Sequence, residues 1–258
     1  MIVKDQLNRT LTFSETPKRV ISLVPSQTEL LVDLGLRDKL VGITKFCVHP
    51  VDLRMEVDVV GGTKNIHLDK IKALKPDVVI CNKEENTEEI VQALSEFVPV
   101  WVSDIYGIED VLDMINQLGV VLDVAERAKE INATLVFERD AFLSVMKDQE
   151  VKKVAYLIWK KPYMAAGNQT FINTLLQINK FKNVFDSRSG RYPEVSLDDL
   201  NEADIVFLSS EPYPFKAADV LALKEALQKE VRLVDGEFFS WYGSRLVKAF
   251  AYFRTLHA

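Results

Sequence analysis

The chain has 258 residues, enough for one large domain or for two lobes of about 110 residues each. Its formal net charge is −6, and the absence of a basic cluster excludes the electrostatic footprint of a nucleic-acid-binding protein. No apolar run approaches the roughly 20 residues that a membrane-spanning helix needs. The opening residues, MIVKDQLNRTLTF, contain no apolar signal-peptide core, so this sequence is expected to carry no export signal.

The first half of the chain alternates short β-branched runs with amphipathic segments, which predicts a parallel sheet covered by helices. A hairpin or edge is expected at residues 4–13, before the first buried strand. Ser26 is predicted to cap the first helix, with Glu29 completing a capping box. The expected strands are 19–24, 40–43, 78–81 and 98–102, and the expected helices are 28–34, 68–74 and 87–97.

One long helix is expected from Asp123 to Lys147. Its apolar residues recur at spacings of three, four and seven, and no Gly or Pro occurs between Gly119 and Pro162. Such a helix would span about 37 Å at about 1.5 Å per residue, which is long for a crossover within one α/β layer. We interpret it as a rigid strut joining two lobes; the alternative is a long packing helix inside a single domain.

After this helix the alternation resumes. The expected strands are 154–159, 204–209 and 231–234, and the expected helices are 171–178, 217–228 and 245–256. The pattern predicts an α/β fold of two Rossmann-like lobes with parallel sheets, about four strands each, joined by one long backbone helix. The predicted divisions are residues 1–122 for the N-terminal lobe, 123–148 for the linking helix and 149–258 for the C-terminal lobe.

Ligands of open parallel sheets bind beyond the carboxyl ends of the strands, which directs attention to the turns after each predicted strand. Ser26 follows the first of these strands, and the later turns are rich in Trp, Tyr and Phe. Aromatic side chains in such turns suit a large, flat, partly apolar ligand gripped between two lobes. The alternative is that about half of them pack the seam between the lobes.

Catalytic motifs are absent: the sequence has no G-x-S-x-G elbow, no Walker loop and no G-x-G-x-x-G, so no enzyme activity is predicted. Cys47, His49 and Glu84 are weak candidates for a soft-metal site. The simpler interpretation makes Cys47 a small buried hydrophobe, with Glu84 and Glu85 favouring the N-terminus of the next helix. No resident metal or cofactor of the chain's own is therefore expected.

Six segments carry a resemblance to a known family. They are RVISLVPSQTELLVDLGL, LVGIT, GGTKNIHLDKIKALKPDVVI, PYMAAGNQTFINTLL, RYPEVSLDDL and GEFFSWYGSRLVKAF. In this order, and over nearly the whole chain, the sequence resembles the helical-backbone (class III) periplasmic substrate-binding proteins of ABC importers. The likeness is strongest to the vitamin B12 (cobalamin) binding proteins, and haem- and siderophore-binding proteins are related. The resemblance implies two α/β lobes joined by one long helix and a periplasmic or cell-envelope location.

The resemblance also implies ligand-binding positions. They are Phe46, Thr63, Asn82, Tyr163 (or Met164, in the alternative register), Tyr192, Glu237 and Trp241, to which the strand-end rule adds Ser26. Thr63 and Asn82 stand where the cobalamin-binding proteins carry aromatic residues, which weakens the case for cobalamin itself. Family members pair one carboxylate on each lobe with transporter arginines, and Asp69 and Asp198 match those positions. Their alternative interpretation is an ordinary first-turn helix carboxylate.

Two functions follow from these expectations. The first is a monomeric binding protein that captures a corrinoid, or a haem or iron-siderophore chelate, and delivers it to an ABC transporter permease. The second is a cytoplasmic corrinoid- or metal-handling protein that uses Cys47 and His49. The aromatic turns favour the first function, and the lack of a visible export signal favours the second.

Overall fold

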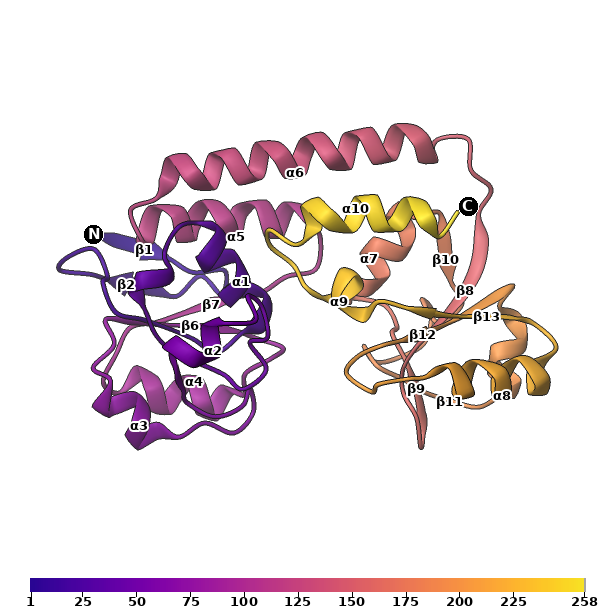
Figure 1. Ribbon diagram of the computed structural model, residues 1–258, viewed down its shortest axis with the longest axis horizontal. Helices are drawn as coiled ribbons and strands as arrows, with labels where there is room; N and C mark the ends of the chain where they lie inside the picture. Colours follow the sequence, from indigo (N-terminus) through magenta and orange to yellow (C-terminus); the bar gives the residue numbers. More distant parts are fainter. Residues whose placement is uncertain (258) are drawn as a thin grey trace. The chain divides into compact units, whose positions relative to one another are not determined.

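The computed structural model describes residues 1–257 and divides the chain into two units (Figure 1). Unit 1 comprises Met1–Val136 and Tyr242–Leu246, and unit 2 comprises Phe137–Trp241 and the residues from Val247 onward. The division differs from the predicted one in two respects. The boundary lies inside the long helix, and a short C-terminal segment returns to unit 1. None of the helices within residues 1–257 is both long enough and apolar enough to cross a bilayer.

Unit 1 is built on a five-stranded parallel sheet with the order β5-β4-β3-β6-β7. The strands are β3 (Val20–Ser22), β4 (Leu40–Ile43), β5 (Asp58–Val59), β6 (Val78–Asn82) and β7 (Val100–Ser103). Because the chain starts in the centre, builds one side and then crosses to the other, the carboxyl ends of β3 and β6 lie at a topological switch point. β5 is the one strand of this sheet that the sequence did not predict. The expected hairpin forms from β1 (Ile2–Lys4) and β2 (Thr10–Thr12).

The helices of unit 1 are α1 (Pro25–Asp33), α2 (Leu53–Glu56), α3 (Leu68–Ala73), α4 (Glu88–Ser95) and α5 (Ile108–Val121), with a 3-10 turn η1 at Arg37–Lys39. The predicted capping box was wrong. α1 begins at Pro25 after Val24 and has no side-chain cap, and Glu29 pairs instead with Arg245. α5 was not predicted, although its buried positions follow a helical spacing and Asp110 accepts from the backbone N–H of Gly107 at its start.

The long helix α6 (Ala125–Met146) was predicted within two residues at each end. It begins after Asp123, whose φ of 60° lies in the left-handed region and cannot continue a helix. In unit 1 it buries Ala128, Ile131 and Leu135, and in unit 2 it buries Phe142, whose ring centroid lies 5.6 Å from that of Phe250. Its residues are divided between the two units, so one continuous helix contributes to both cores.

Unit 2 is a mixed sheet with the order β11-β9-β8-β12-β13, in which β10 also pairs with β8. The strands are β8 (Lys152–Trp159), β9 (Tyr163–Ala165), β10 (Phe181–Asn183), β11 (Glu194–Val195), β12 (Ile205–Ser209) and β13 (Glu230–Val234). β10, β12 and β13 run parallel to the sheet's central direction, whereas β9 pairs antiparallel with both β8 and β11. The three strands that the sequence predicted, β8, β12 and β13, pair in parallel as expected, and the short strand β9 adds an antiparallel pair because it folds back on the end of β8. The helices are α7 (Phe171–Ile178), α8 (Ala217–Leu227), α9 (Gly236–Ser240) and α10 (Leu246–Thr255), with a 3-10 helix η2 at Asp198–Glu202.

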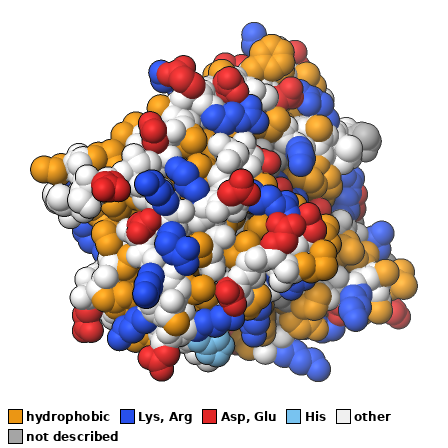
Figure 2. Space-filling model, turned by 60° about the vertical axis from the view of Figure 1, so that its left-hand side comes forward, with side chains coloured by type: hydrophobic (Ala, Val, Ile, Leu, Met, Phe, Trp, Pro, Cys, Tyr) orange, Lys and Arg blue, Asp and Glu red, His pale blue; other side chains and the backbone are white. Residues whose placement is uncertain are grey.

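The surface is consistent with the composition. Figure 2 shows Lys and Arg side chains interspersed with Asp and Glu over the visible face, without a continuous field of one sign.

Candidate functional site

The carboxyl edge of the unit 1 sheet brings together the N-terminal candidates. Ser26 follows β3, Phe46 follows β4, Thr63 follows β5, and Asn82 is the last residue of β6. Because all five strands are parallel, these four positions lie on one edge of the sheet, as the strand-end rule predicts.

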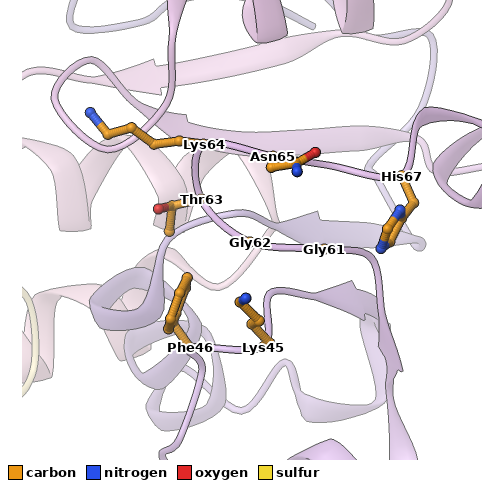
Figure 3. Close-up of a pocket in the computed structure, with 8 residues that line it drawn as sticks. All are labelled: Lys45, Phe46, Gly61, Gly62, Thr63, Lys64, Asn65 and His67. Carbon is orange, nitrogen blue, oxygen red and sulfur yellow. The ribbon is translucent and has the colours of Figure 1, made fainter.

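A pocket of about 480 Å³ opens on this edge, at the ends of β4 and β5 (Figure 3). It is lined by Lys45, Phe46, Gly61, Gly62, Thr63, Lys64, Asn65 and His67. Phe46 is 49% exposed, and in Figure 3 its ring rises toward the Gly62–Thr63 segment. Two of the candidate ligand residues, Phe46 and Thr63, therefore line one cavity, with an aromatic wall open to solvent.

Asn82 has a structural task at the same edge. Its Oδ1 accepts from the backbone N–H groups of Glu84 and Glu85, at 2.8 and 3.1 Å, and its Nδ2 donates to the carbonyl and hydroxyl oxygens of Ser103. Asn86 in turn accepts from the Asn82 backbone N–H. These bonds hold the turn after β6, and a direct ligand contact by Asn82 stays a prediction.

The returning segment Tyr242–Leu246 covers the switch point of unit 1, which the sequence did not indicate. Ser26 is buried, and the Tyr242 phenol lies beside the hydroxyls of Ser26 and Ser103. Burial raises the pKa of Tyr242 well above its ordinary value, so the phenol stays neutral at physiological pH. Three residues on, Arg245 makes a bidentate ion pair with Glu29 of α1. Ser26 therefore sits beneath the chain's own C-terminal segment.

The remaining candidates lie in unit 2: one in β9, one just before β11, and two in or just after α9. Tyr163 packs against the core of the unit, Tyr192 is half-buried, and Glu237 lies in the first turn of α9. Trp241 follows α9 and is only 7% exposed. Its burial differs from the open loop position that the sequence suggested, so Trp241 contributes to packing as well as to any ligand contact. Close by, Trp159 is 41% exposed and meets Tyr213 edge to face, with ring centroids 5.6 Å apart.

Glu211 holds the candidate residue Trp241, and it lies in a strand-end turn from which the sequence did not single it out. Its Oε1 accepts from the Ser240 hydroxyl at 2.6 Å and from the Trp241 indole N–H at 2.9 Å. Burial raises the pKa of this carboxyl, the negative charges of Glu237 and Asp235 raise it further, and the two hydrogen bonds lower it. The only sequence signal was its place directly after β12, at the carboxyl edge.

The weak metal candidates do not form a metal site. Cys47 is fully buried, with its Sγ 3.1 Å from Thr28 Oγ1 and 3.3 Å from Thr44 Oγ1. Burial raises the pKa of its thiol, which disfavours the thiolate that a metal would require. Over the described residues 1–257, no group of three or more His, Cys, Asp or Glu side chains is placed to hold a metal ion. Cys47, His49 and Glu84 thus do not come together as the metal-handling alternative required.

The two docking candidates occupy equivalent local settings. Asp69 is exposed in the first turn of α3, and Asp198 is exposed at the first position of η2. In each case the carboxylate is free to face a partner from a helix start, where negative charge is also locally favourable. Their role in docking stays a prediction.

A family model described as periplasmic binding protein matches residues 20–230. The chain belongs to the periplasmic binding protein family. The match takes in most of unit 1, all of α6 and unit 2 as far as the start of β13. It thus includes every candidate ligand residue except Glu237 and Trp241.

Relatives of this family member include named transport proteins. The vitamin B12-binding protein of Vibrio parahaemolyticus is 27% identical over 203 residues, which are 77% of this chain and 74% of that protein. An uncharacterized ABC transporter substrate-binding lipoprotein of Bacillus subtilis, YvrC, is 28% identical over 197 residues, which are 73% of this chain and 62% of that protein.

Solved structures show the same fold. The periplasmic vitamin B12 binding protein BtuF of Vibrio cholerae aligns with a TM-score of 0.80 at 20% identity, covering 93% of this chain and 96% of that one. The periplasmic haem binding protein HutB of Vibrio cholerae aligns with a TM-score of 0.77 at 20% identity, covering 93% and 98%. These findings confirm the recognised family and the α/β fold class. The relatives named here are substrate-binding transport proteins rather than enzymes.

Proposed function

We propose that this protein binds a corrinoid of the cobalamin type outside the cytoplasm and delivers it to the permease of an ABC importer. The observation that carries the proposal is the half-exposed Phe46 ring on the wall of a pocket of about 480 Å³, at the carboxyl edge of a parallel sheet. A solvent-facing aromatic ring at this place offers a flat apolar surface to a macrocycle. The vitamin B12-binding relatives support the corrinoid class.

Haem or an iron siderophore is the second candidate ligand. Thr63 and Asn82 stand where cobalamin-binding proteins carry aromatic residues, so the site offers less ring surface than a cobalamin site of that type. The proposal assigns direct contacts to Phe46 and Thr63 of unit 1, which line the pocket, and none to Ser26, which lies beneath Tyr242–Leu246. From unit 2 it assigns them to Tyr163, Tyr192, Glu237 and Trp241.

Phe46→Ala should weaken ligand binding by about thirtyfold, because removing a large aromatic side chain from a packed contact typically costs about 2 kcal/mol. The exposed ring contributes little to the core, so the thermal unfolding midpoint should stay unchanged. Isothermal calorimetry with cobalamin, cobinamide, haem, a ferric siderophore and zinc measures the affinities. The visible absorption spectrum of the purified protein reports whether a coloured chelate co-purifies.

Phe97→Ala is the matched control, because Phe97 is another partly exposed phenylalanine of unit 1 that lies outside the pocket. It should leave all five affinities unchanged. If the two substitutions have equal effects, or if Phe46→Ala changes the affinity for no chelate, Phe46 does not contact the ligand as proposed. Zinc binding that depends on Cys47 or His49 would restore the metal-handling alternative.

The second prediction concerns the permease. Reversing both Asp69 and Asp198 to lysine should abolish uptake of the ligand while its affinity for the isolated protein stays unchanged, because rim charges set register and encounter rate. Uptake by cells that carry the cognate transporter is measured beside calorimetry. The control reverses Glu15 and Glu150, two exposed carboxylates with one in each unit, and should transport normally. Normal uptake by the Asp69/Asp198 variant would show that these two carboxylates are not needed for docking to the permease.

A further inference from the structure

We propose that the pocket beside Gly62 is an anion site, in which Lys45 and Lys64 hold a phosphodiester or carboxylate group of the bound chelate. The inference deepens the proposed function and rests on it for the identity of the chelate. It starts from the composition of the lining: two lysines and His67 contribute to it, and no Asp or Glu does. A basic cavity in a chain of net charge −6 runs against the overall electrostatic balance.

The charges of the two lysines are not neutralised. Within residues 1–257 neither ammonium pairs with a carboxylate. Lys64 Nζ donates to the backbone carbonyl of Glu84 at 3.0 Å, and Lys45 Nζ lies 5.0 Å from the centroid of the Phe46 ring. Carbonyl and ring contacts leave the positive charge in place, so both groups remain available to an anion.

Neighbouring carboxylates are already engaged by other cations. Lys70 Nζ lies 2.8 Å from Asp58 Oδ1, and Lys83 Nζ lies 2.6 Å from Asp104 Oδ2. Asp52 and Glu56 both pair with Arg37, at 2.7 and 2.9 Å. These four carboxylates thus have partners other than Lys45 and Lys64.

The shape of the pocket depends on glycine at position 62. A Cβ at this position would lie 3.2 Å from Phe46 Cε2, so the ring would have to move by a few tenths of an ångström, and 3.6 Å from Lys45 Cε, an ordinary contact distance. Figure 3 shows Lys45 and Phe46 on one side of the Gly61–Thr63 segment and Lys64 on the other. Lysine stems are flexible, so Lys64 would turn from the Glu84 carbonyl to join Lys45 at an anion bound at this segment, while an apolar body rests on Phe46.

Such a site selects chelates by their acidic groups. Cobalamin carries a phosphodiester in its nucleotide loop, which cobinamide lacks, and haem carries two propionates, which its dimethyl ester masks. Each pair shares a macrocycle; the haem pair differs in its carboxylates, and the cobalamin pair differs in the phosphodiester together with the ribose and base attached to it. Because hydrogen bonds to ionised groups are about twice as strong as neutral ones, we expect the double variant Lys45→Gln/Lys64→Gln to bind the anionic member about tenfold or more weakly.

Calorimetry at low and high salt tests this expectation with all four macrocycles. The double variant should lose affinity for cobalamin or haem, and the wild-type affinity for that ligand should fall as salt rises. The double variant should bind cobinamide and the haem dimethyl ester with the same affinity as the wild type. The matched control, Lys4→Gln/Lys18→Gln, removes two exposed lysines of unit 1 outside the pocket and should behave as wild type. Loss for cobalamin alone or for haem alone identifies which anion the site serves.

A direct probe separates this inference from the proposed function. Inorganic pyrophosphate added to the ligand-free protein should shift the backbone amide signals of Gly61–Asn65 in heteronuclear NMR spectra. The shifts should be absent in the Lys45/Lys64 variant and present in the control variant. If the protein binds none of the four macrocycles yet shows these shifts, the chelate class is wrong and the anion site stands. If it binds a chelate but both lysine variants match the wild type and pyrophosphate shifts nothing, the anion site is overturned and the proposed function stands.

Discussion

Arg245→Leu is expected to lower the free energy of unfolding by about 3–5 kcal/mol, because it leaves a buried carboxylate without its partner. Arg245 Nε lies 2.7 Å from Glu29 Oε2, and its Nη2 lies 3.0 Å from Glu29 Oε1. Both side chains are 10% exposed, so water cannot replace the lost guanidinium. Urea unfolding followed by circular dichroism measures the change.

The matched control is Arg127→Leu. Arg127 lies 2.8 Å from Glu130 in an ion pair whose side chains are 53% and 65% exposed. Solvent screens such a pair, so its loss should cost under about 1 kcal/mol. A comparable loss in both variants would mean that the Glu29–Arg245 pair behaves as a surface pair.

Removing both charges separates the energy of the pair from the penalty for an unpaired group. The double variant Glu29→Met/Arg245→Leu should recover most of the stability lost by Arg245→Leu, because it buries no unpaired charge. A double variant that is as unstable as Arg245→Leu would show that Arg245 acts through packing alone. In the wild type, Arg245 attaches the segment Tyr242–Leu246 to α1 of unit 1 through Glu29.

Local patterns account for the elements that the sequence predicted. β4 and α7 were predicted to the residue, because each is a continuous apolar or amphipathic run with a clear stop on either side. β9, β10 and β11 were missed because strands of two or three residues carry no period, and they exist only through their pairing in the sheet. α5 is different: its helical spacing was present in the sequence and was overlooked.

The same contrast applies to the candidate site: the sequence indicated some of its residues, but not the contacts between residues far apart in the chain. The position of Phe46 followed from the strand-end rule and from the family resemblance, whereas that of Thr63 followed from the resemblance alone, because the sequence did not predict β5. The cover that Tyr242 places over Ser26 could not be foreseen, because it joins residues from opposite ends of the chain. The Glu29–Arg245 pair spans 216 residues for the same reason, and no spacing rule reaches that far.

Glu211→Leu is expected to destabilise the protein by about 1–3 kcal/mol, because the Trp241 indole N–H loses the Glu211 carboxylate, whereas the Ser240 hydroxyl keeps the Gly236 carbonyl as an acceptor. The start of α9 and the turn after β12 are closely packed around Glu211. A Cβ on Gly236 would already lie 2.4 Å from Ser209 Oγ and 2.6 Å from Glu211 Cγ, so the start of α9 is pressed against the turn after β12. Urea unfolding measures the stability, and the tryptophan emission maximum should move to longer wavelength as Trp241 is released.

Glu211→Gln keeps an acceptor oxygen and isolates the charge. Burial raises the pKa of Glu211 in the folded state, so the folded protein binds its proton more tightly than the unfolded chain. The stability that this proton contributes is present below the unfolded pKa of about 4.3 and is lost as pH rises through the folded pKa. Glutamine does not titrate, so the stability of Glu211→Gln relative to wild type should increase from about pH 4 to about pH 7. The matched control, Glu225→Gln on the exposed face of α8, should show no such trend. A relative stability of Glu211→Gln that is flat across this range would mean that Glu211 is not held in a proton-favouring environment.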